Sequence, residues 1–243
     1  MLIREATSHR DLDEVTRIQR EVWNIEDTEI VGRIQLKASQ HAGGSVLVAE
    51  ADGGEIAGFA YAFPAIIEGE AFWHSDMLAV RPRFRGTRVG QNLKWGQRDH
   101  ARSKGVKRIT WTFDPMQAGN AHLNLELLGA TVAEYLSNFY GVTTSTLHHG
   151  LPTDRLLASW DLESPRVTSL LRGERPAGVD RATLIPIPAA WNELVRQEPE
   201  RARAEQQRVE KDLRAAFARG LIVTGFDKAA SSYVLSEPRS STP

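Results

Sequence analysis

The chain contains no cysteine among its 243 residues, and this absence removes whole classes of chemistry. It excludes disulfide frameworks, thiolate metal sites and mechanisms that use a thiol nucleophile. Long apolar runs are also missing, because the longest nearly apolar stretch, residues 57–67, is too short to cross a bilayer. The N-terminal region soon becomes charged and shows no secretory signal, so we expect a cytoplasmic protein with no membrane association.

Net charge is almost absent as well, since 30 Lys and Arg face 31 Asp and Glu. A sum over the whole chain can still hide a local field. Residues 81–108 hold ten Lys or Arg and a single acid, Asp99, which gives this segment a charge of +9 and leaves −10 elsewhere. The chain therefore has one strongly basic segment. A hydrophobic fraction of 41% and a charged fraction of 25% otherwise indicate an ordinary globular protein.

Periodicity and turn residues predict an α/β fold (α+β mixed) over the first two thirds of the chain. The expected order is strand, two helices, three strands, helix, strand, helix and two strands, which implies a mixed sheet covered by helices. The expected strands are residues 2–7, 45–51, 55–65, 71–80, 106–113, 131–136 and 155–162. The expected helices start after Ser8 and cover about residues 29–41, 89–103 and 119–128.

The composition of the sequence changes after residue 163, because turn-forming Pro and Gly residues recur in residues 165–190. A strand at 183–187, a charged helix at 199–219 and a closing hairpin from 221 to 235 are expected there. We therefore predict a first domain at residues 1–162 and a small α/β C-terminal extension at residues 163–243.

An anion site is expected where the strand ending at Val80 turns into the helix that begins near Val89. A helix N-terminus offers free backbone N–H groups and the positive end of the helix dipole. Gly86 and Gly90 leave no side chain between those amides and a phosphate, while Arg85 and Arg88 add charge. The alternative interpretation is a solvated basic face. The spacing fits neither the lysine-containing phosphate loop nor the dinucleotide fingerprint.

The pattern Val80-x-Pro82-x-x-Arg85-Gly86-x-x-x-Gly90-x-x-Leu93 resembles the acyl-CoA motif of the GNAT acyltransferase superfamily. Residues 78–130 resemble an uncharacterised branch of predicted GNAT acetyltransferases that carries a C-terminal extension. The resemblance covers residues 1–162 and implies a mostly antiparallel mixed sheet with flanking helices. It also implies an N-acyltransferase, with acetyl-CoA or another acyl-CoA as co-substrate.

The resemblance further implies which residues hold the cofactor. Backbone groups of residues 78–80 would pair with the pantetheine arm, the amides of residues 85–90 would hold the pyrophosphate, and Asn120 would hydrogen-bond the pantetheine or carbonyl or else cap a helix. One departure stands out, because Arg88 replaces a glycine of the usual motif. The implied cofactor-binding residues are Leu78, Ala79, Val80, Arg85, Gly86, Thr87, Arg88, Val89, Gly90 and Asn120.

Candidates for acid–base chemistry lie on the strand before the motif. Alternation places His74 and Asp76 on one face. We expect His74 to act as the base, and Asp76 to orient it, bind the acceptor ammonium, or be an ordinary solvated residue. The family's usual acid, a tyrosine, is replaced by Leu125, so Tyr140 or Tyr135 is expected to supply the proton. Each of these side chains can also be read as purely structural.

The acceptor is expected to be a small-molecule amine or an amino acid, and the absence of cysteine favours direct transfer. Two alternatives remain open: a non-catalytic module that binds acyl-CoA, and a nucleic-acid surface on the basic segment, which lacks any recognition motif. A homodimer is possible. The three histidines His122, His148 and His149 show no metal-ligand spacing, so no metal is expected.

Overall fold

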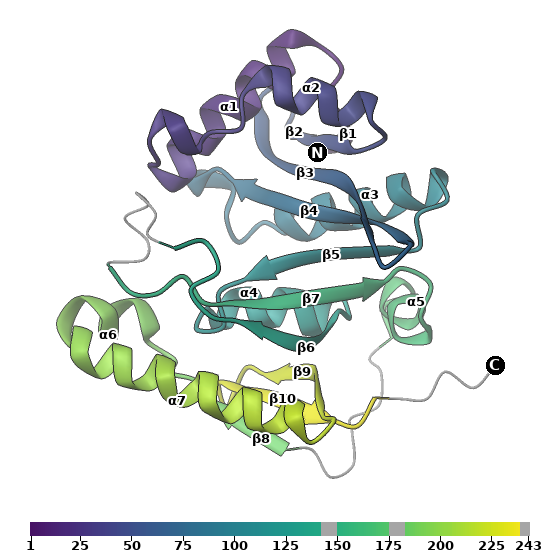
Figure 1. Cartoon of the computed structure of the whole chain (residues 1–243). Coiled ribbons are helices and arrows are strands. Elements are labelled where there is room, and N and C mark those ends of the chain that lie inside the picture. Colours follow the sequence, from purple (N-terminus) through teal and green to yellow (C-terminus); the bar gives the residue numbers. More distant parts are fainter. Residues whose placement is uncertain (142–149, 175–182, 239–243) are drawn as a thin grey trace. The chain divides into compact units, whose positions relative to one another are not determined.

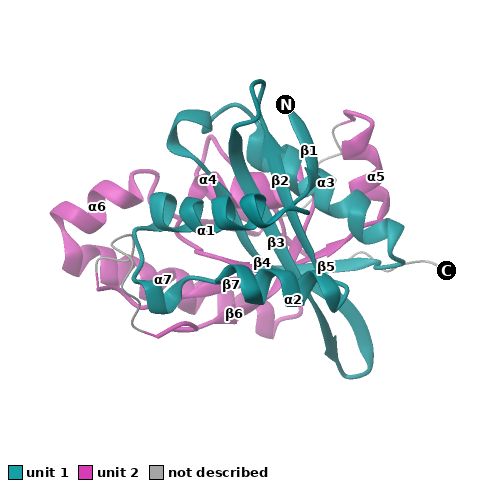
Figure 2. Ribbon diagram, turned by 90° about the horizontal axis from the view of Figure 1, so that it is seen from above, with its two compact units in different colours: residues 1–111, 144–147 teal, residues 112–143, 148–243 magenta. Residues whose placement is uncertain are grey.

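The computed structural model describes residues 1–141, 150–174 and 183–238, which form two compact units. Unit 1 comprises residues 1–111, and unit 2 comprises the described residues from 112 onward (Figure 2). Each unit has its own strands and helices, and each is described by itself below.

Unit 1 is built on a twisted sheet with the strand order β1-β2-β3-β4-β5. Its strands are β1 (Leu2–Glu5), β2 (Ser45–Glu50), β3 (Ile56–Ile67), β4 (Glu70–Val80) and β5 (Arg108–Phe113), of which β5 ends inside unit 2. The first four strands pair antiparallel, and β5 pairs parallel to β4. This confirms the expected mixed, mostly antiparallel sheet.

The helices of unit 1 begin where the sequence offers caps. The helix α1 (His9–Trp23) starts at Ser8, whose hydroxyl accepts from Asp11 N while the Asp11 side chain accepts from Ser8 N, a reciprocal capping box. The helix α2 (Arg33–His41) follows a short 3-10 turn, η1 (Asp27–Glu29), and α3 (Val89–Ser103) follows another, η2 (Pro82–Phe84). The bounds of α3 agree with the expected helix.

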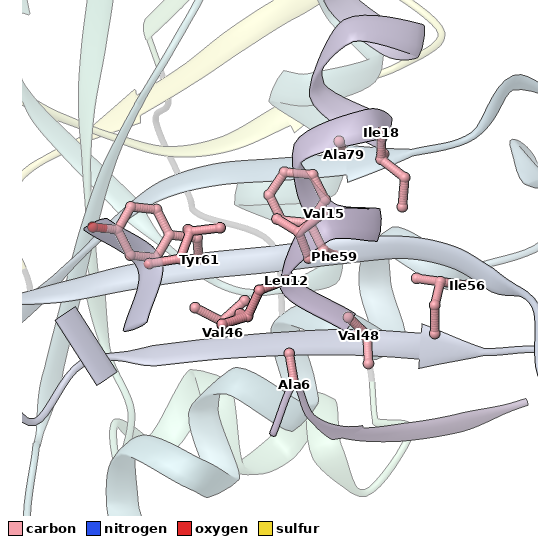
Figure 3. Packing of buried hydrophobic residues seen from close by; sticks show 11 residues of the cluster. Ala6, Leu12, Val15, Ile18, Val46, Val48, Ile56, Phe59, Tyr61 and Ala79 are labelled. Atoms are coloured by element: carbon pink, nitrogen blue, oxygen red, sulfur yellow. The ribbon is translucent and has the colours of Figure 1, made fainter. Parts of the chain in front are cut away.

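Helices cover both faces of this sheet. Residues of α1 pack on side chains of β2 and β3, as Figure 3 shows for Leu12 and Val15 over Val46 and Phe59. Each of these four side chains is fully buried, and each such burial contributes about 1.5–3 kcal/mol. Alternate residues of the same strands pack instead against Leu93 of α3. The core thus fixes β3 and β4 between two layers of helix.

Unit 2 is built on antiparallel strands in the order β7-β6-β9-β10-β8. The strands are β6 (Thr131–Leu136), β7 (Arg155–Asp161), β8 (Thr183–Pro186), β9 (Ile222–Asp227) and β10 (Ser232–Ser236). The helices are α4 (Ala118–Ala121), the π-helix η3 (His122–Leu127), α5 (Pro165–Leu171), α6 (Trp191–Gln197) and α7 (Pro199–Ala218), labelled in Figure 1 except for η3.

Two expectations need correction in unit 2. The helix expected at 119–128 is one turn of α-helix followed by a π-helix, and α5 and α6 were not expected at all. The expected domain boundary after residue 162 falls inside unit 2, where β9 of the extension pairs with β6 through Val132 and Val223. The division into residues 1–162 and 163–243 stays a prediction. Within the described ranges, none of the helices is long and apolar enough to span a membrane.

Candidate active site

Strand β4 loses its parallel neighbour halfway along its length. Among the described residues, β4 pairs with β5 only at Trp73–Ile109 and His74–Thr110, whereas its pairing with β3 continues to Val80. Arg81 N donates to Ala57 O at 2.9 Å, so alternation along the strand turns the N–H and C=O groups of Val80 and Leu78 away from β3. Leu78 therefore presents a free N–H and a free C=O along one edge of β4. Val80 presents a free N–H there, while its C=O accepts from Arg85 Nε at 3.3 Å. The same alternation turns the peptide groups of Ala79 toward β3, so Ala79 offers none to a ligand.

A β-bulge lies next to this edge. His74 pairs with Phe63 and Met77 pairs with Tyr61, so Ser75 and Asp76 share one opposing residue. The bulge interrupts the strict alternation from which a shared face of His74 and Asp76 is expected, so that shared face stays a prediction. No hydrogen bond or ion pair joins these two side chains. Instead, His74 Nδ1 lies 3.0 Å from Thr110 Oγ1, and sequence reasoning missed Thr110 altogether.

The protonation of these two groups is shifted in opposite directions. Burial lowers the pKa of His74, and the nearby charge of Lys94 lowers it further. The removal of water around Asp76 raises the pKa of its carboxyl, although the residue still reaches solvent. Asp76 makes no hydrogen bond or ion pair with any residue of the described part. At neutral pH, His74 therefore favours its neutral form and Asp76 is a stronger base than an ordinary carboxylate.

Lys94 lies beneath the bulge rather than in the anion site. Its side chain is 2% exposed, and Nζ donates to Ser75 Oγ at 3.0 Å and to Gln97 Oε1 at 2.9 Å. Nζ also lies 3.8 Å from the centre of the Trp111 ring, in cation–π contact. Lys94 thus ties α3 to β4 and β5 where these two strands part. Its place in the basic segment gave no sign of this role.

The turn before α3 forms the expected row of backbone donors. Within the described chain, the N–H groups of residues 86–91 donate to no protein acceptor. Arg88 adopts a left-handed conformation (φ 64°, ψ 8°) at the N-cap of α3, which is the conformation that a glycine adopts without strain. Arg85 and Arg88 are both exposed and form no ion pair with a described residue. The turn therefore combines free amides with two available guanidinium groups.

The glycine of the motif at position 90 has a different role from the one expected. A Cβ built on Gly90 would lie 3.6 Å from Val80 Cγ2 and 3.8 Å from Leu78 Cδ2, so it would point toward β4 and away from a bound anion. Gly86, in contrast, has open space around its Cβ position and a φ of 78°. Gly86 thus adopts a backbone conformation that favours glycine, whereas a Cβ at Gly90 would make ordinary van der Waals contact with β4.

Much of the basic segment is neutralised by acids from elsewhere in unit 1. Arg81 binds Glu14 and Glu21, Arg83 binds Glu55, and Arg108 Nη2 lies 2.8 Å from Glu70 Oε2. The local field is thus weaker than the sequence count of +9 suggests. Arg85 and Arg88 form no ion pair with a described residue, so positive charge is available at the turn for an anion.

The remaining candidates belong to unit 2. Leu125 is fully buried, which confirms that this position offers no acid. Tyr135 is buried and donates to Asp154 Oδ2 at 2.6 Å; burial is the main reason that its pKa is raised, so it is a poor acid. Tyr140 is exposed, and its hydroxyl lies 2.8 Å from Thr112 Oγ1. Asn120 is exposed on α4 and is not its N-cap, a place taken by Gln117. Tyr140 is therefore the available phenol.

Two further observations concern aromatic residues and metal. The strand aromatics Phe72, Trp73, Trp111 and Phe113 are all buried, so they belong to the core. Within the part of the chain that the structure describes, no three His, Asp or Glu side chains are placed to hold a metal ion. His148 and His149 lie outside the described residues.

Solved structures with the same fold come from several acetyltransferases. The ribosomal-protein-S18-alanine N-acetyltransferase from Escherichia coli is 17% identical, with a TM-score of 0.51 over 67% of this chain and 94% of its own. The aminoglycoside 6'-acetyltransferase type Ii is 18% identical, with a TM-score of 0.51 over 68% of this chain and 99% of its own. A putative acetyltransferase from Salmonella typhimurium, solved with its cofactor acetyl-CoA, is 20% identical, with a TM-score of 0.51 over 74% and 98%.

Sequence comparison leads to the same family. No curated protein sequence matches the chain significantly. The family model of the acetyltransferase (GNAT) family, however, matches residues 10–129, a range that contains β4, the anion turn and α3. Together with the shared fold, this match shows that residues 10–129 form a domain of the GNAT acetyltransferase family.

Proposed function

We propose that the protein transfers an acyl group, in the simplest case acetyl, from acyl-CoA directly to an amine. One observation carries the proposal: the free peptide groups of Leu78 and the free N–H of Val80 lead along β4 to the free amides of residues 86–91. This arrangement offers hydrogen bonds first to the amides of a pantetheine arm and then to a pyrophosphate at a helix N-terminus.

The charges at the turn fit the cofactor. Coenzyme A carries a pyrophosphate and a ribose phosphate, and the exposed Arg85 and Arg88 offer bidentate donors to such groups. Asn120 of unit 2 is exposed and free to contact the pantetheine arm, as its place in the family's motif suggests. An acyl-CoA held in this way exposes its thioester for attack.

The reaction is a direct transfer. The acceptor amine loses a proton, and its nitrogen attacks the thioester carbonyl carbon. A C–N bond forms, the C–S bond breaks, and coenzyme A departs as a thiolate that takes up a proton. His74 and Asp76 are the groups near β4 that can assist the first stages, and Tyr140 is the proposed donor of the final proton. Holding both substrates together supplies much of the acceleration.

The acceptor is proposed to be a small-molecule amine or an amino acid. The similar enzymes act on an aminoglycoside and on the alanine of a ribosomal protein, and both are amine acceptors. A carboxylate without a protein partner, Asp76, suits an acceptor that arrives as an ammonium ion.

Isothermal titration calorimetry with acetyl-CoA, longer acyl-CoAs and free CoA tests the cofactor site. We expect saturable binding that the double variant Arg85→Ala/Arg88→Ala weakens at least tenfold, because two charge-assisted contacts are lost. The matched control is Arg17→Ala, an exposed arginine on α1 whose loss leaves binding unchanged. No binding to any of these ligands would refute the proposal.

Thiol release in the presence of an amine panel separates catalysis from binding alone. We expect acceptor-dependent release of free CoA from acetyl-CoA, detected with a thiol reagent. Binding of acetyl-CoA without release across amino acids, polyamines, aminoglycosides and peptides would instead favour the non-catalytic acyl-CoA-binding module, for which the replacement of the usual tyrosine by Leu125 is the supporting observation.

A further inference from the structure

The hydroxyl of Thr110 has one possible partner. Thr110 is 4% exposed, and His74 Nδ1, at 3.0 Å, is its only hydrogen-bond partner among the described residues. A buried hydroxyl carries one proton that needs an acceptor, because an unsatisfied donor costs about 1–3 kcal/mol. The proton of Thr110 is therefore directed at Nδ1 of His74.

This hydrogen bond decides the tautomer of the imidazole. In neutral histidine one ring nitrogen donates and the other accepts. When Nδ1 accepts from Thr110, the ring proton must lie on Nε2. Nε2 makes no hydrogen bond with any described residue, so its proton is left for a group outside the described protein. A neutral imidazole in this state cannot take a proton at Nε2.

We propose that Thr110 holds His74 as the neutral Nε2–H tautomer, so that His74 donates a hydrogen bond to the acyl carbonyl oxygen while Asp76 accepts the proton of the attacking amine. The oxygen gains negative charge as the C–N bond forms, and a fixed donor stabilises that charge. This inference rests on the proposed acyl transfer and changes the base expected from the sequence. His74 and Asp76 contact the reactants, and Thr110 is a positioning residue.

The surroundings of both groups support this division of roles. Burial and the nearby charge of Lys94 both favour neutral His74, and the Phe63 ring, 5.4 Å from the imidazole centre, offers no charge to stabilise an imidazolium. A carboxylate facing the ring would favour the charged form, and no described acid contacts it. Asp76, in contrast, is exposed at the surface and has no hydrogen-bond or ion-pair partner among the described residues, and partial loss of water around its carboxyl raises its pKa.

The tautomer can be read without any substrate. Nitrogen-15 NMR of the histidine side chains in the whole protein, with the His74 signals identified by their loss in His74→Gln, distinguishes a protonated Nε2 from a protonated Nδ1. We expect the Nε2–H pattern in the wild type and in Thr110→Ser, and a mixed or charged pattern in Thr110→Val. The matched control Thr112→Val removes a hydroxyl that bonds Tyr140 instead of a histidine, and the His74 signals should stay unchanged.

Kinetics then test the two roles. A glutamine amide can replace an Nε2–H donor but cannot act as a base, so we expect His74→Gln to retain at least tenfold more kcat/KM than His74→Ala. The acidic limb of the pH profile should disappear in Asp76→Asn and persist in His74→Gln. Thr110→Val should lower kcat, and Thr110→Ser should restore it.

Several outcomes overturn the inference. An Nδ1–H pattern in the wild type does so directly, even if acyl transfer is observed. Equal activity of His74→Gln and His74→Ala also overturns it. So does an acidic limb of the pH profile that disappears in His74→Gln and persists in Asp76→Asn. Because the NMR measurement needs no acyl-CoA, failure of the proposed function and failure of this inference give different results.

Discussion

Replacement of Arg88 by glycine is expected to stabilise the protein while weakening the binding of acyl-CoA. Arg88 holds φ at 64° and ψ at 8°, a left-handed conformation that costs an L-residue about 1–2 kcal/mol. Glycine removes that cost but gives the unfolded chain more freedom, which offsets about 0.4–1 kcal/mol. The net expectation is a gain of about 0.5–1 kcal/mol in the free energy of unfolding.

Arg88→Ala is the reference that isolates the backbone effect. It loses the same guanidinium but keeps a Cβ in the strained conformation, so its stability should stay within about 0.5 kcal/mol of the wild type. Gly86→Ala is the reverse experiment. Gly86 has a φ of 78° and open space for a Cβ, so alanine there adds strain without a clash and should cost about 1 kcal/mol.

Thermal unfolding and calorimetry measure the two effects separately. For a chain of this size, 1 kcal/mol corresponds to a shift of about 2–4 °C in Tm. Arg88→Gly should unfold above Arg88→Ala by roughly that shift. Both variants should bind acetyl-CoA about tenfold more weakly, because one charge-assisted contact of about 1.5 kcal/mol is lost.

The affinities of the two variants also decide what Arg88 does at the site. If Arg88→Gly binds acetyl-CoA as tightly as the wild type, amide access matters more than the guanidinium charge. If Arg88→Gly is no more stable than Arg88→Ala, the reasoning from the left-handed backbone is wrong.

Further predictions concern stability and the proposed acid. Asp11→Asn should lower the free energy of unfolding by roughly 1–3 kcal/mol at pH 7 in urea denaturation. The Arg4 guanidinium holds the pKa of Asp11 well below its usual value. The difference between variant and wild type should therefore shrink as pH falls below about 4, where aspartate in the unfolded chain takes up protons. Burial lowers the pKa of Lys94, so unfolding takes up a proton at pH values between that lowered pKa and about 10.5, the ordinary pKa of lysine. The free energy of unfolding of the wild type should therefore rise with pH across that range, and Lys94→Met should lose this rise. Leu125→Tyr should not restore the family's usual acid, because the site is fully buried, and overpacking should cost about 1–3 kcal/mol in thermal unfolding. Tyr140→Phe should change stability by less than about 0.5 kcal/mol, since the side chain is exposed, yet lower kcat at least tenfold; an unchanged kcat removes Tyr140 as the acid.

Local signals predicted the elements near the site well. The bounds of α3 and β6 follow from glycine and polar residues at their ends, and the turn before α3 follows from its Arg and Gly content. The helices α5 and α6 are only seven residues long, which is too short for a periodic apolar stripe. The π-helix η3 has no sequence signature that separates it from α-helix.

Contacts between distant residues were not predictable. The pairing of His74 with Thr110 depends on the register of β4 against β5 across 36 residues, and the burial of Lys94 depends on the packing of α3. A bulge of one residue on β4 interrupts the alternation from which the face of Asp76 is predicted, and nothing in the sequence signals that bulge. The sequence could suggest which residue types reach the site, but the partner of each group is a tertiary property.

The bonds that join the C-terminal segment to the earlier part of unit 2 have a consequence for how the chain folds. Tyr233 donates to Pro115 O at 2.7 Å and Phe226 N donates to Glu126 Oε1 at 2.8 Å, across sequence separations of 118 and 100 residues. Such closures are slow because their entropy is lost before any contact forms. During synthesis, the edge of strand β6 that pairs with β9 therefore stays unpaired until β9 has been translated. We expect the nascent chain to be most prone to aggregation during this interval.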